Sequence, residues 1–335
     1  MSRMEKYWND IRTVAPYSFS FIPTLLVVYG NLAGGLWSVA NSAFMLVFLV
    51  IIDWFVPRHA HKIPDVPAQL PDIILLCSVA AHTLAAATFA YSLHNGILQN
   101  EWRTWAAIST GLNAGLIGIN TAHELIHRKE KMLQKLGIWN LFLSSYTHFY
   151  IEHRLGHHLR VGTTQDPATA RYGENFYAFL VRTIPAQWLS ALRIENKKNN
   201  TWLKNFVVRS AIAQLTFYGL LAYWGGLTLL LFWLLQCAIA IFLLEYVNYI
   251  EHYGLERKQG EKVNLQHAWQ SDSITSRFAL FELSRHADHH IKAYKPYHTL
   301  ESHTEGLYLP SGYFGMFYVA LIPPLWFGLM NKKEN

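Results

Sequence analysis

Cysteine is nearly absent from this chain, which contains only Cys77 and Cys237 among its 335 residues. Both lie within long apolar stretches, so no disulfide framework can hold the loops together, and this usage suits a reducing compartment. No C-x2-C pair occurs, which excludes a fused rubredoxin-type or iron–sulfur electron carrier. A G-x-G-x-x-G fingerprint for a flavin or nicotinamide dinucleotide is also missing.

Charged residues are scarce as well, at 15% of the chain against 52% hydrophobic residues. This balance is far more apolar than that of an average soluble domain. Six apolar stretches reach or approach the roughly 20 residues that span a bilayer. A seventh stretch, 313–330, is interrupted by Pro323 and Pro324, which favours an interfacial or re-entrant segment over a full span. The predicted transmembrane helices lie near residues 17–36, 38–56, 73–93, 102–122, 205–224 and 227–249.

The basic residues are distributed unevenly between the two sides that these helices define. One side carries 27 of the 28 Lys and Arg residues, and Arg103 alone lies on the other. By the positive-inside rule, both termini and the long segments 123–204 and 252–310 lie on the cytoplasmic side of the cell inner membrane. The isoelectric point near 9.1 therefore reports topology and contact with anionic lipid, not nucleic-acid binding. Helical patterning within the first cytoplasmic segment covers 135–150 and 175–194.

Histidine stands out against this apolar background. Nine of the 17 histidines fall in three clusters and one further motif, all just outside the predicted spans. Neutral imidazole binds iron, copper and zinc well, and spacings of three and four place two rings on one helix face. Nine imidazoles exceed what one ion of coordination number four to six can use, which predicts a dinuclear metal centre. The nine predicted ligands are His123, His127, His153, His157, His158, His252, His286, His289 and His290.

Four carboxylates stand next to or near clustered histidines: Glu124, Glu152, Glu251 and Asp288. We expect them to accept hydrogen bonds from the ring N–H groups that face away from the metal, although a bridging role is also open. Asp53, near the cytoplasmic end of the second predicted span, is a functional candidate because it is ionisable at the membrane edge. A solvated helix end explains Asp53 equally well. The isolated histidines are expected to hydrogen-bond in loops or interfaces: His59, His61, His148, His267, His298 and His303.

Two other functions compete with a dinuclear redox centre. The motif H-E-L-I-H at residues 123–127 matches the zincin signature, in which Glu124 would act as the general base of a protease. A zincin needs one further protein ligand, however, and seven further clustered histidines favour the dinuclear centre. A non-catalytic metal transporter or sensor would place histidines or carboxylates along a path inside the spans. The clusters in this chain lie outside the spans.

The histidine motifs resemble those of the membrane-bound di-iron alkane hydroxylases, which belong to the fatty-acid desaturase and hydroxylase histidine-box superfamily. The resemblance covers residues 118–290 and rests on N-T-A-H-E-L-I-H-R, E-H-R-L-G-H-H-L-R-V-G-T-T-Q-D-P-A-T-A-R, N-Y-I-E-H-Y-G-L and R-H-A-D-H-H. It implies an all-α integral membrane fold of six transmembrane helices with a cytoplasmic histidine-box cap, formed as a single domain over 1–335. It also implies two iron ions held by all nine histidines, with O2 as co-substrate and terminal hydroxylation of alkanes drawn from the bilayer.

The resemblance does not decide which substrate the protein oxidises or which reaction of the superfamily it catalyses. The H-Y-G element and the three-residue gap in the second box favour hydrocarbon hydroxylases over desaturases. The third box, however, begins L-S-R where L-Q-R is common, and the chain length approaches that of the xylene methyl hydroxylases. Methyl hydroxylation of alkyl-aromatics, and desaturation or hydroxylation of fatty-acyl lipids, are therefore retained as alternatives. Because this sequence contains no electron carrier, we expect a separate rubredoxin or ferredoxin with an NAD(P)H-dependent reductase.

Overall fold

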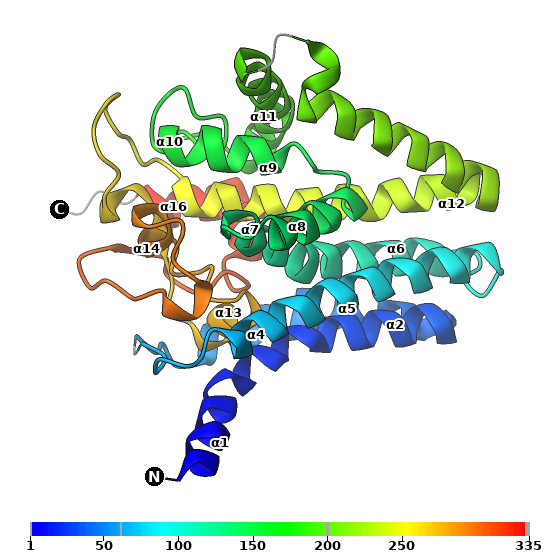
Figure 1. Ribbon diagram of the computed structural model, residues 1–335, viewed down its shortest axis with the longest axis horizontal. Helices are drawn as coiled ribbons and strands as arrows, with labels where there is room; N and C mark the ends of the chain where they lie inside the picture. Colours follow the sequence, from blue (N-terminus) through cyan, green and yellow to red (C-terminus); the bar gives the residue numbers. More distant parts are fainter. Residues whose placement is uncertain (1, 61, 199–200, 332–335) are drawn as a thin grey trace.

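The structure is a computed structural model that describes residues 2–60, 62–198 and 201–331, so the isolated His61 lies outside the described residues. It is mostly helical, and its long helices run side by side away from an end that holds both chain termini (Figure 1). The first helices form the edge of this bundle. Ser2 caps the first of them by accepting a hydrogen bond from the Glu5 N–H at 3.2 Å. The elements up to residue 94 are α1 (Arg3–Val14), η1 (Ala15–Phe21), α2 (Ile22–Ala33), η2 (Gly35–Val39), α3 (Ala40–Ala43), η3 (Phe44–Leu49), α4 (Val50–Phe55) and α5 (Gln69–His94).

The central part of the chain carries the next long helices and the first histidine boxes. The segment 102–127 is one continuous helix with a π-helical stretch in its middle. The helix expected over 135–150 begins earlier and ends at Leu143, because Ser145 adopts a left-handed φ of +59°. The helix expected over 175–194 is present. The elements are α6 (Trp102–Asn113), η4 (Ala114–Ile119), α7 (Asn120–His127), α8 (Lys131–Leu143), α9 (Phe149–Glu152), η5 (His153–His157), α10 (His158–Arg160), α11 (Phe176–Lys198) and η6 (Trp202–Lys204).

Helix α12 (Phe206–His252) consists of two arms that meet at Gly226. This glycine has φ +72° and ψ −177°, a conformation that other residues rarely adopt. Figure 1 shows the chain turning back there, so that the second arm returns toward the end that carries the termini. The break lies between the two helices predicted at 205–224 and 227–249. Gly111 and Gly115 let the helix 102–127 pack closely on the second arm of α12. A Cβ atom at either position would lie within 3.0 Å of atoms of that arm.

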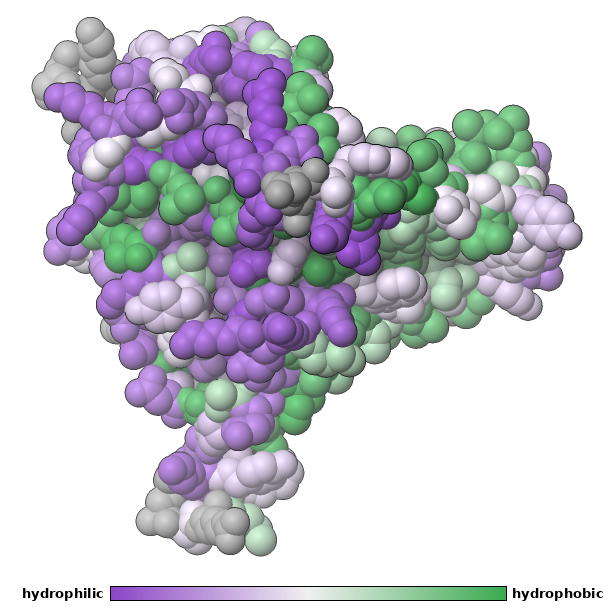
Figure 2. All heavy atoms as spheres, turned by 45° about the horizontal axis from the view of Figure 1, so that its top comes forward, coloured by the Kyte–Doolittle hydropathy of each residue, from purple (hydrophilic) through white to green (hydrophobic). Residues whose placement is uncertain are grey.

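Among the described residues, four helical stretches are long and apolar enough to cross a membrane: Met4–Ala33, Gly35–Phe55, Gln69–His94 and Phe206–His252. In the most apolar window of each, only 28% to 44% of the residues are buried inside the protein. Apolar side chains therefore point outward from the bundle, which water would disfavour and lipid would accept. Figure 2 shows the same division, with hydrophobic residues along the projecting helices and hydrophilic residues gathered at the other end. These features indicate a membrane protein.

The C-terminal third folds over the end of α12 and closes the polar end of the molecule. The apolar segment 313–330 is broken at Ile322, as its two prolines predict, and Trp326 within it is fully buried against Tyr249 and Tyr253. Two short strands pair in parallel, with Trp269 opposite Leu307. The elements are η7 (Leu265–His267), β1 (Trp269–Gln270), α13 (Ile274–Ala279), α14 (His286–Ile291), η8 (Tyr297–Thr299), β2 (Leu307–Tyr308), α15 (Phe317–Leu321) and α16 (Pro323–Met330).

Candidate metal centre

The first histidine box lies on α7, at the end of the continuous helix 102–127. His123 and His127 are one turn apart on the same face, with ring centroids separated by 5.3 Å. The Nε2 atoms of both rings are buried and have no hydrogen-bond partner among the described residues. Both rings also pack against His153 of the second box, at centroid distances of 4.5 and 5.0 Å. The helix therefore delivers two imidazoles with buried, unpaired ring nitrogens to one place.

The second box lies on the π-helical segment η5 and the residue that follows it. A π-helix has a wider turn than an α-helix, and such segments are frequent at functional sites. Here the Nε2 atoms of His153 and His158, five residues apart, approach to 3.0 Å. His157 lies instead against the third box, with its Nε2 at 3.3 Å from the Nε2 of His290. The local geometry thus divides one box between two groups of histidines.

The third box and His252 complete the arrangement. On α14, His286 and His290 are one turn apart and their Nε2 atoms are separated by 2.9 Å. His252 is the last residue of α12, and its Nε2 lies 3.2 Å from that of His286. His289, on another face of α14, directs its Nε2 to within 3.1 Å of the His158 Nε2. The third box, like the second, therefore contributes to both groups.

All nine predicted histidines converge into two groups, within each of which the candidate ligand atoms lie within 4.8 Å of one another. Nitrogen ligands about 2.1 Å from one ion and at right angles to each other are about 3 Å apart, which is the spacing found here. The spacing of the ring nitrogens in both groups therefore suits the binding of metal ions. The five-histidine group is His123, His127, His153, His158 and His289, and the four-histidine group is His157, His252, His286 and His290.

Burial also prepares these imidazoles for metal binding. It lowers the pKa of His153, His158, His289 and His290 well below the ordinary value, and the neighbouring histidines lower each of these pKa values further. The rings are therefore neutral at physiological pH and keep a lone pair on one nitrogen. Closely spaced lone pairs in a buried site repel one another unless a cation lies between them. The chemistry of the donor set therefore suits a metal ion.

Asp166 is the carboxylate that orients a clustered histidine, and the sequence reasoning missed it. Its Oδ2 accepts a hydrogen bond from the His157 Nδ1 at 2.8 Å and another from the Thr169 hydroxyl at 2.6 Å. Burial would raise the pKa of Asp166, but the interactions with His157 and Thr169 outweigh it and lower the pKa. With Nδ1 protonated toward Asp166, the Nε2 lone pair of His157 faces the four-histidine group. The motif T-T-Q-D-P-A-T contains this residue, nine positions beyond the histidine.

The expectation for three of the four predicted carboxylates is corrected. Glu124 accepts from Arg128 at 2.9 Å, Glu152 from Arg160 at 2.6 Å, and Asp288 from Lys295 at 2.6 Å. Among the described residues, none of these three carboxylates hydrogen-bonds a clustered histidine. Adjacent residues on a helix point about 100° apart, so a carboxylate that neighbours a clustered histidine in the sequence does not lie beside the ring of that histidine.

Glu251 alone of the four reaches the centre. Its Oε2 lies 3.2 Å from the Nε2 of His286, the same nitrogen that approaches His252. Its Oε1 accepts a hydrogen bond from the Tyr313 hydroxyl at 2.9 Å. The isolated His303 contacts Asp288 at 3.0 Å, as expected of a histidine outside the clusters. Asp53 is buried and accepts hydrogen bonds from Ser273, Ser276 and the Gly315 N–H. Asp53 is therefore a structural tether between segments, not a solvated helix end.

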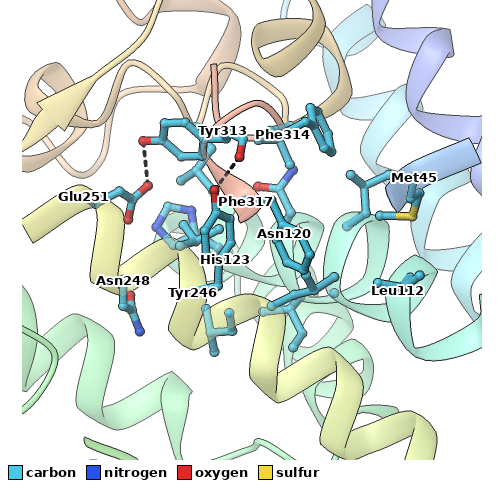
Figure 3. A pocket seen from close by; sticks show the side chains of 18 of the residues that line it. Met45, Leu112, Asn120, His123, Tyr246, Asn248, Glu251, Tyr313, Phe314 and Phe317 are labelled. Carbon is cyan, nitrogen blue, oxygen red and sulfur yellow. Dashed lines mark hydrogen bonds between the residues drawn. The ribbon is translucent and has the colours of Figure 1, made fainter. Parts of the chain in front are cut away.

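A narrow apolar cavity leads from the histidines into the helix bundle (Figure 3). Glu251 and His123 lie toward one end, whereas Met45 and Leu112 lie on the other side of the cavity from Glu251. His153, which packs on His123, and His286, which contacts Glu251, also line the cavity. The walls between the two sides are almost entirely apolar. They include Leu116, Ile119, Phe149, Leu243, Leu244, Tyr246, Val247, Leu280, Leu283, Phe314 and Phe317.

We expect Asp166→Ala to lower iron affinity or turnover by about 10- to 100-fold, the usual cost of removing a partner that orients a metal-bound histidine. Asp166→Asn keeps an oxygen acceptor without the charge, and its loss should be smaller. Bound iron and product formation measured on the purified proteins test this order. Asp65→Asn, which changes an exposed carboxylate paired with Lys62, is the matched control. Equal iron content and turnover in all four proteins would refute a role for Asp166.

Comparison with known proteins agrees with this geometry. The fatty acid desaturase family matches residues 100–320. The chain is 34% identical to alkane 1-monooxygenase 1 of Pseudomonas aeruginosa, over 87% of this chain and 82% of that protein. It is 33% identical to alkane 1-monooxygenase 2 of Alcanivorax borkumensis, over 89% and 82%, and 28% identical to the xylene/toluene monooxygenase hydroxylase component of Pseudomonas putida, over 93% and 86%. The resemblance seen in the four motifs is confirmed. The chain belongs to the fatty acid desaturase family and, within it, to the alkane 1-monooxygenases.

Proposed function

We propose that this protein hydroxylates the terminal methyl group of alkanes to 1-alkanols, with O2, at a non-haem di-iron centre held by the nine histidines. The observation that carries the proposal is the pair of buried histidine groups at the end of an apolar cavity. The names of its relatives, alkane 1-monooxygenases, support the same reaction. A terminal C–H bond offers no acidic proton, electrophile or dipole for ordinary side-chain catalysis, so iron, when bound, supplies the oxygen activation.

The protein's own residues position the substrate and keep the centre dry. The walls of the cavity, which are apolar apart from a few side chains such as Asn120 and Asn248, bind an alkyl chain by burial. His123, His153 and His286 border the cavity, so a methyl group at this end lies next to both histidine groups. Asp166 keeps the Nε2 of His157 unprotonated and directed into the four-histidine group.

The proposal includes six membrane spans and a cytoplasmic cap in the cell inner membrane. Counting the two arms of α12 separately and adding the helix 102–127 to the other three apolar helices gives six. The distribution of Lys and Arg supports a cytoplasmic position for the histidines and both termini. Because the cavity lies between bundle helices whose outer faces are apolar, an alkane dissolved in the bilayer can enter without crossing water.

Methyl hydroxylation of alkyl-aromatics is the second candidate, favoured by the 28% identity to the xylene/toluene component over 93% of the chain. Gas chromatography of products from cells fed octane, a longer alkane, xylene or acyl lipids separates the candidates. We expect 1-alkanols as the main products. Methylbenzyl alcohol as the dominant product would select the second candidate. Modified acyl chains without any alkanol would overturn both in favour of a lipid desaturase or hydroxylase.

We expect Leu112 to limit the length of alkane that the cavity accepts. It precedes His123 by eleven residues on one helix, a rise of about 16 Å, and it lines the cavity. Leu112→Phe should shift products toward shorter alkanes and Leu112→Ala toward longer ones, each by roughly 10-fold in relative rate. An equimolar ladder of alkanes fed to cells measures the shift. Leu25→Phe, the same change at a side chain exposed on the outer face of α2, is the control. Identical product ladders in all variants would contradict this limit.

A further inference from the structure

A second cavity lies apart from the histidine centre, between the loop 144–148, helix α11 and the first arm of α12. Its volume is about 650 Å³, within the range of sites that hold small organic ligands. No Lys, Arg, Asp or Glu lines it among the described residues. The function proposed above makes no use of this cavity.

Two buried polar side chains that line this cavity carry atoms with unused hydrogen-bonding capacity. His148 and Gln214 are 7% and 8% exposed. Within the described part of the chain, the Nε2 of His148 makes no hydrogen bond, and the amide atoms of Gln214 make none of good geometry, although the Tyr218 hydroxyl lies near that amide. An unsatisfied buried polar group costs about 1–3 kcal/mol, so folded proteins seldom leave such atoms without a partner. These atoms offer a ligand both donors and acceptors.

The electrostatics of the cavity select an uncharged head group. A carboxylate or phosphate would be desolvated there without a counter-charge from any lining side chain. Burial lowers the pKa of His148 to about 3, so the imidazole stays neutral at physiological pH and supplies no such charge. A hydroxyl group, in contrast, can donate one hydrogen bond and accept others in a neutral site.

The mouth of the cavity is apolar and suits an alkyl tail. Trp188 and Leu189 of α11 and Leu215 of α12 line it and are 38%, 42% and 68% exposed. Leu215 belongs to an apolar helix long enough to cross a membrane, so this side of the cavity borders lipid. A ligand with its head near His148 and Gln214 would leave its chain between α11 and the bilayer.

We propose that this cavity is a binding site for a neutral long-chain alcohol. One layer of side chains separates it from the histidine cavity: Tyr146 and Ile241 line the one, Phe149 and Leu244 line the other, and all four pack in one cluster. The inference rests on the cavity alone. A 1-alkanol formed under the proposed function belongs to the same chemical class.

Photolabelling of the purified full-length protein tests the site. Three probes are compared, each carrying a diazirine at the same position on a chain of the same length. They are a long-chain primary alcohol, the corresponding carboxylic acid and the corresponding alkane. We expect the alcohol to label peptides of α11 and of the first arm of α12 roughly 10-fold more than either analogue, because only its hydroxyl pairs with the buried groups. Gln214→Leu should remove this advantage, and Ala211→Phe should block all three probes by filling the cavity.

Leu220→Phe, at an exposed position on the same arm, is the matched control and should label like the natural protein. Unlabelled 1-alkanol should compete in the natural protein, which keeps the test valid if a variant does not fold. Competition by diacylglycerol but not by 1-alkanol would assign the cavity to a membrane lipid and overturn the proposal. Equal labelling by the three probes would reduce the cavity to a lipid-filled groove and also overturn it. Neither readout depends on hydroxylation, so failure of the proposed function is detected separately.

Discussion

Replacing His252 by Ala is expected to abolish hydroxylation and to lower bound iron from about two ions to about one per chain. His252 is fully buried at the end of α12 and is one of only four histidines in its group. Its loss leaves three imidazoles there and the five-histidine group intact. Iron analysis of the purified variant, together with alkanol formation, measures both effects. We expect turnover to fall by at least about 100-fold.

Two further variants serve as comparisons for His252→Ala. His290→Ala removes a second member of the same group and should match His252→Ala in iron content and activity. His94→Ala changes an unclustered histidine, stacked on Trp224 at 4.3 Å, and should behave like the natural protein. Normal iron content and turnover without His252 would make this residue structural. One zinc and no iron in the natural protein would refute the di-iron proposal and restore the zincin interpretation of H-E-L-I-H.

The second large effect concerns the electron supply: purified protein with NADH alone should form no product. Oxygen-dependent hydroxylation consumes two electrons beyond those of the C–H bond, and this chain has neither a dinucleotide fingerprint nor a cysteine cluster to deliver them. Addition of rubredoxin or ferredoxin and its NAD(P)H-dependent reductase should start turnover. The measurement is alkanol formed with NADH, first alone and then with the donor proteins. Full activity with NADH alone would contradict a separate donor.

The same experiment tests how the donor docks. The expected cytoplasmic side carries 27 of the 28 Lys and Arg residues, which favours a small acidic partner. Electrostatic steering weakens as salt shortens the Debye length, to about 10 Å at 0.1 M. With limiting rubredoxin, we expect the rate to fall by roughly 10-fold across a salt series. A small uncharged chemical reductant should show no such dependence. A flat response with rubredoxin would remove the docking proposal and leave the donor requirement in place.

Several elements of the fold were predictable because their signals are local. The interruption at Gly226 and the broken segment at Pro323 follow from the conformational limits of glycine and proline. The nine histidines were identifiable from spacings of three and four on helices, and all nine converge. The helix over 135–150 was wrong at its end, because the left-handed turn at Ser145 has no strong signal in the sequence.

The sequence by itself determined which histidines gather, and the tertiary structure decided how they divide. H-x3-H-H pairs His153 with His157 by α-helical spacing, yet the π-helical turn places His153 with His158 and sends His157 to the other group. Asp166 reaches His157 through a turn, whereas Glu152, next to His153 in the chain, points to Arg160. Spacing specifies a shared helix face, but contacts between segments depend on how loops and helix ends pack. For the same reason, the second cavity, built from three separate segments, has no signature in any one of them.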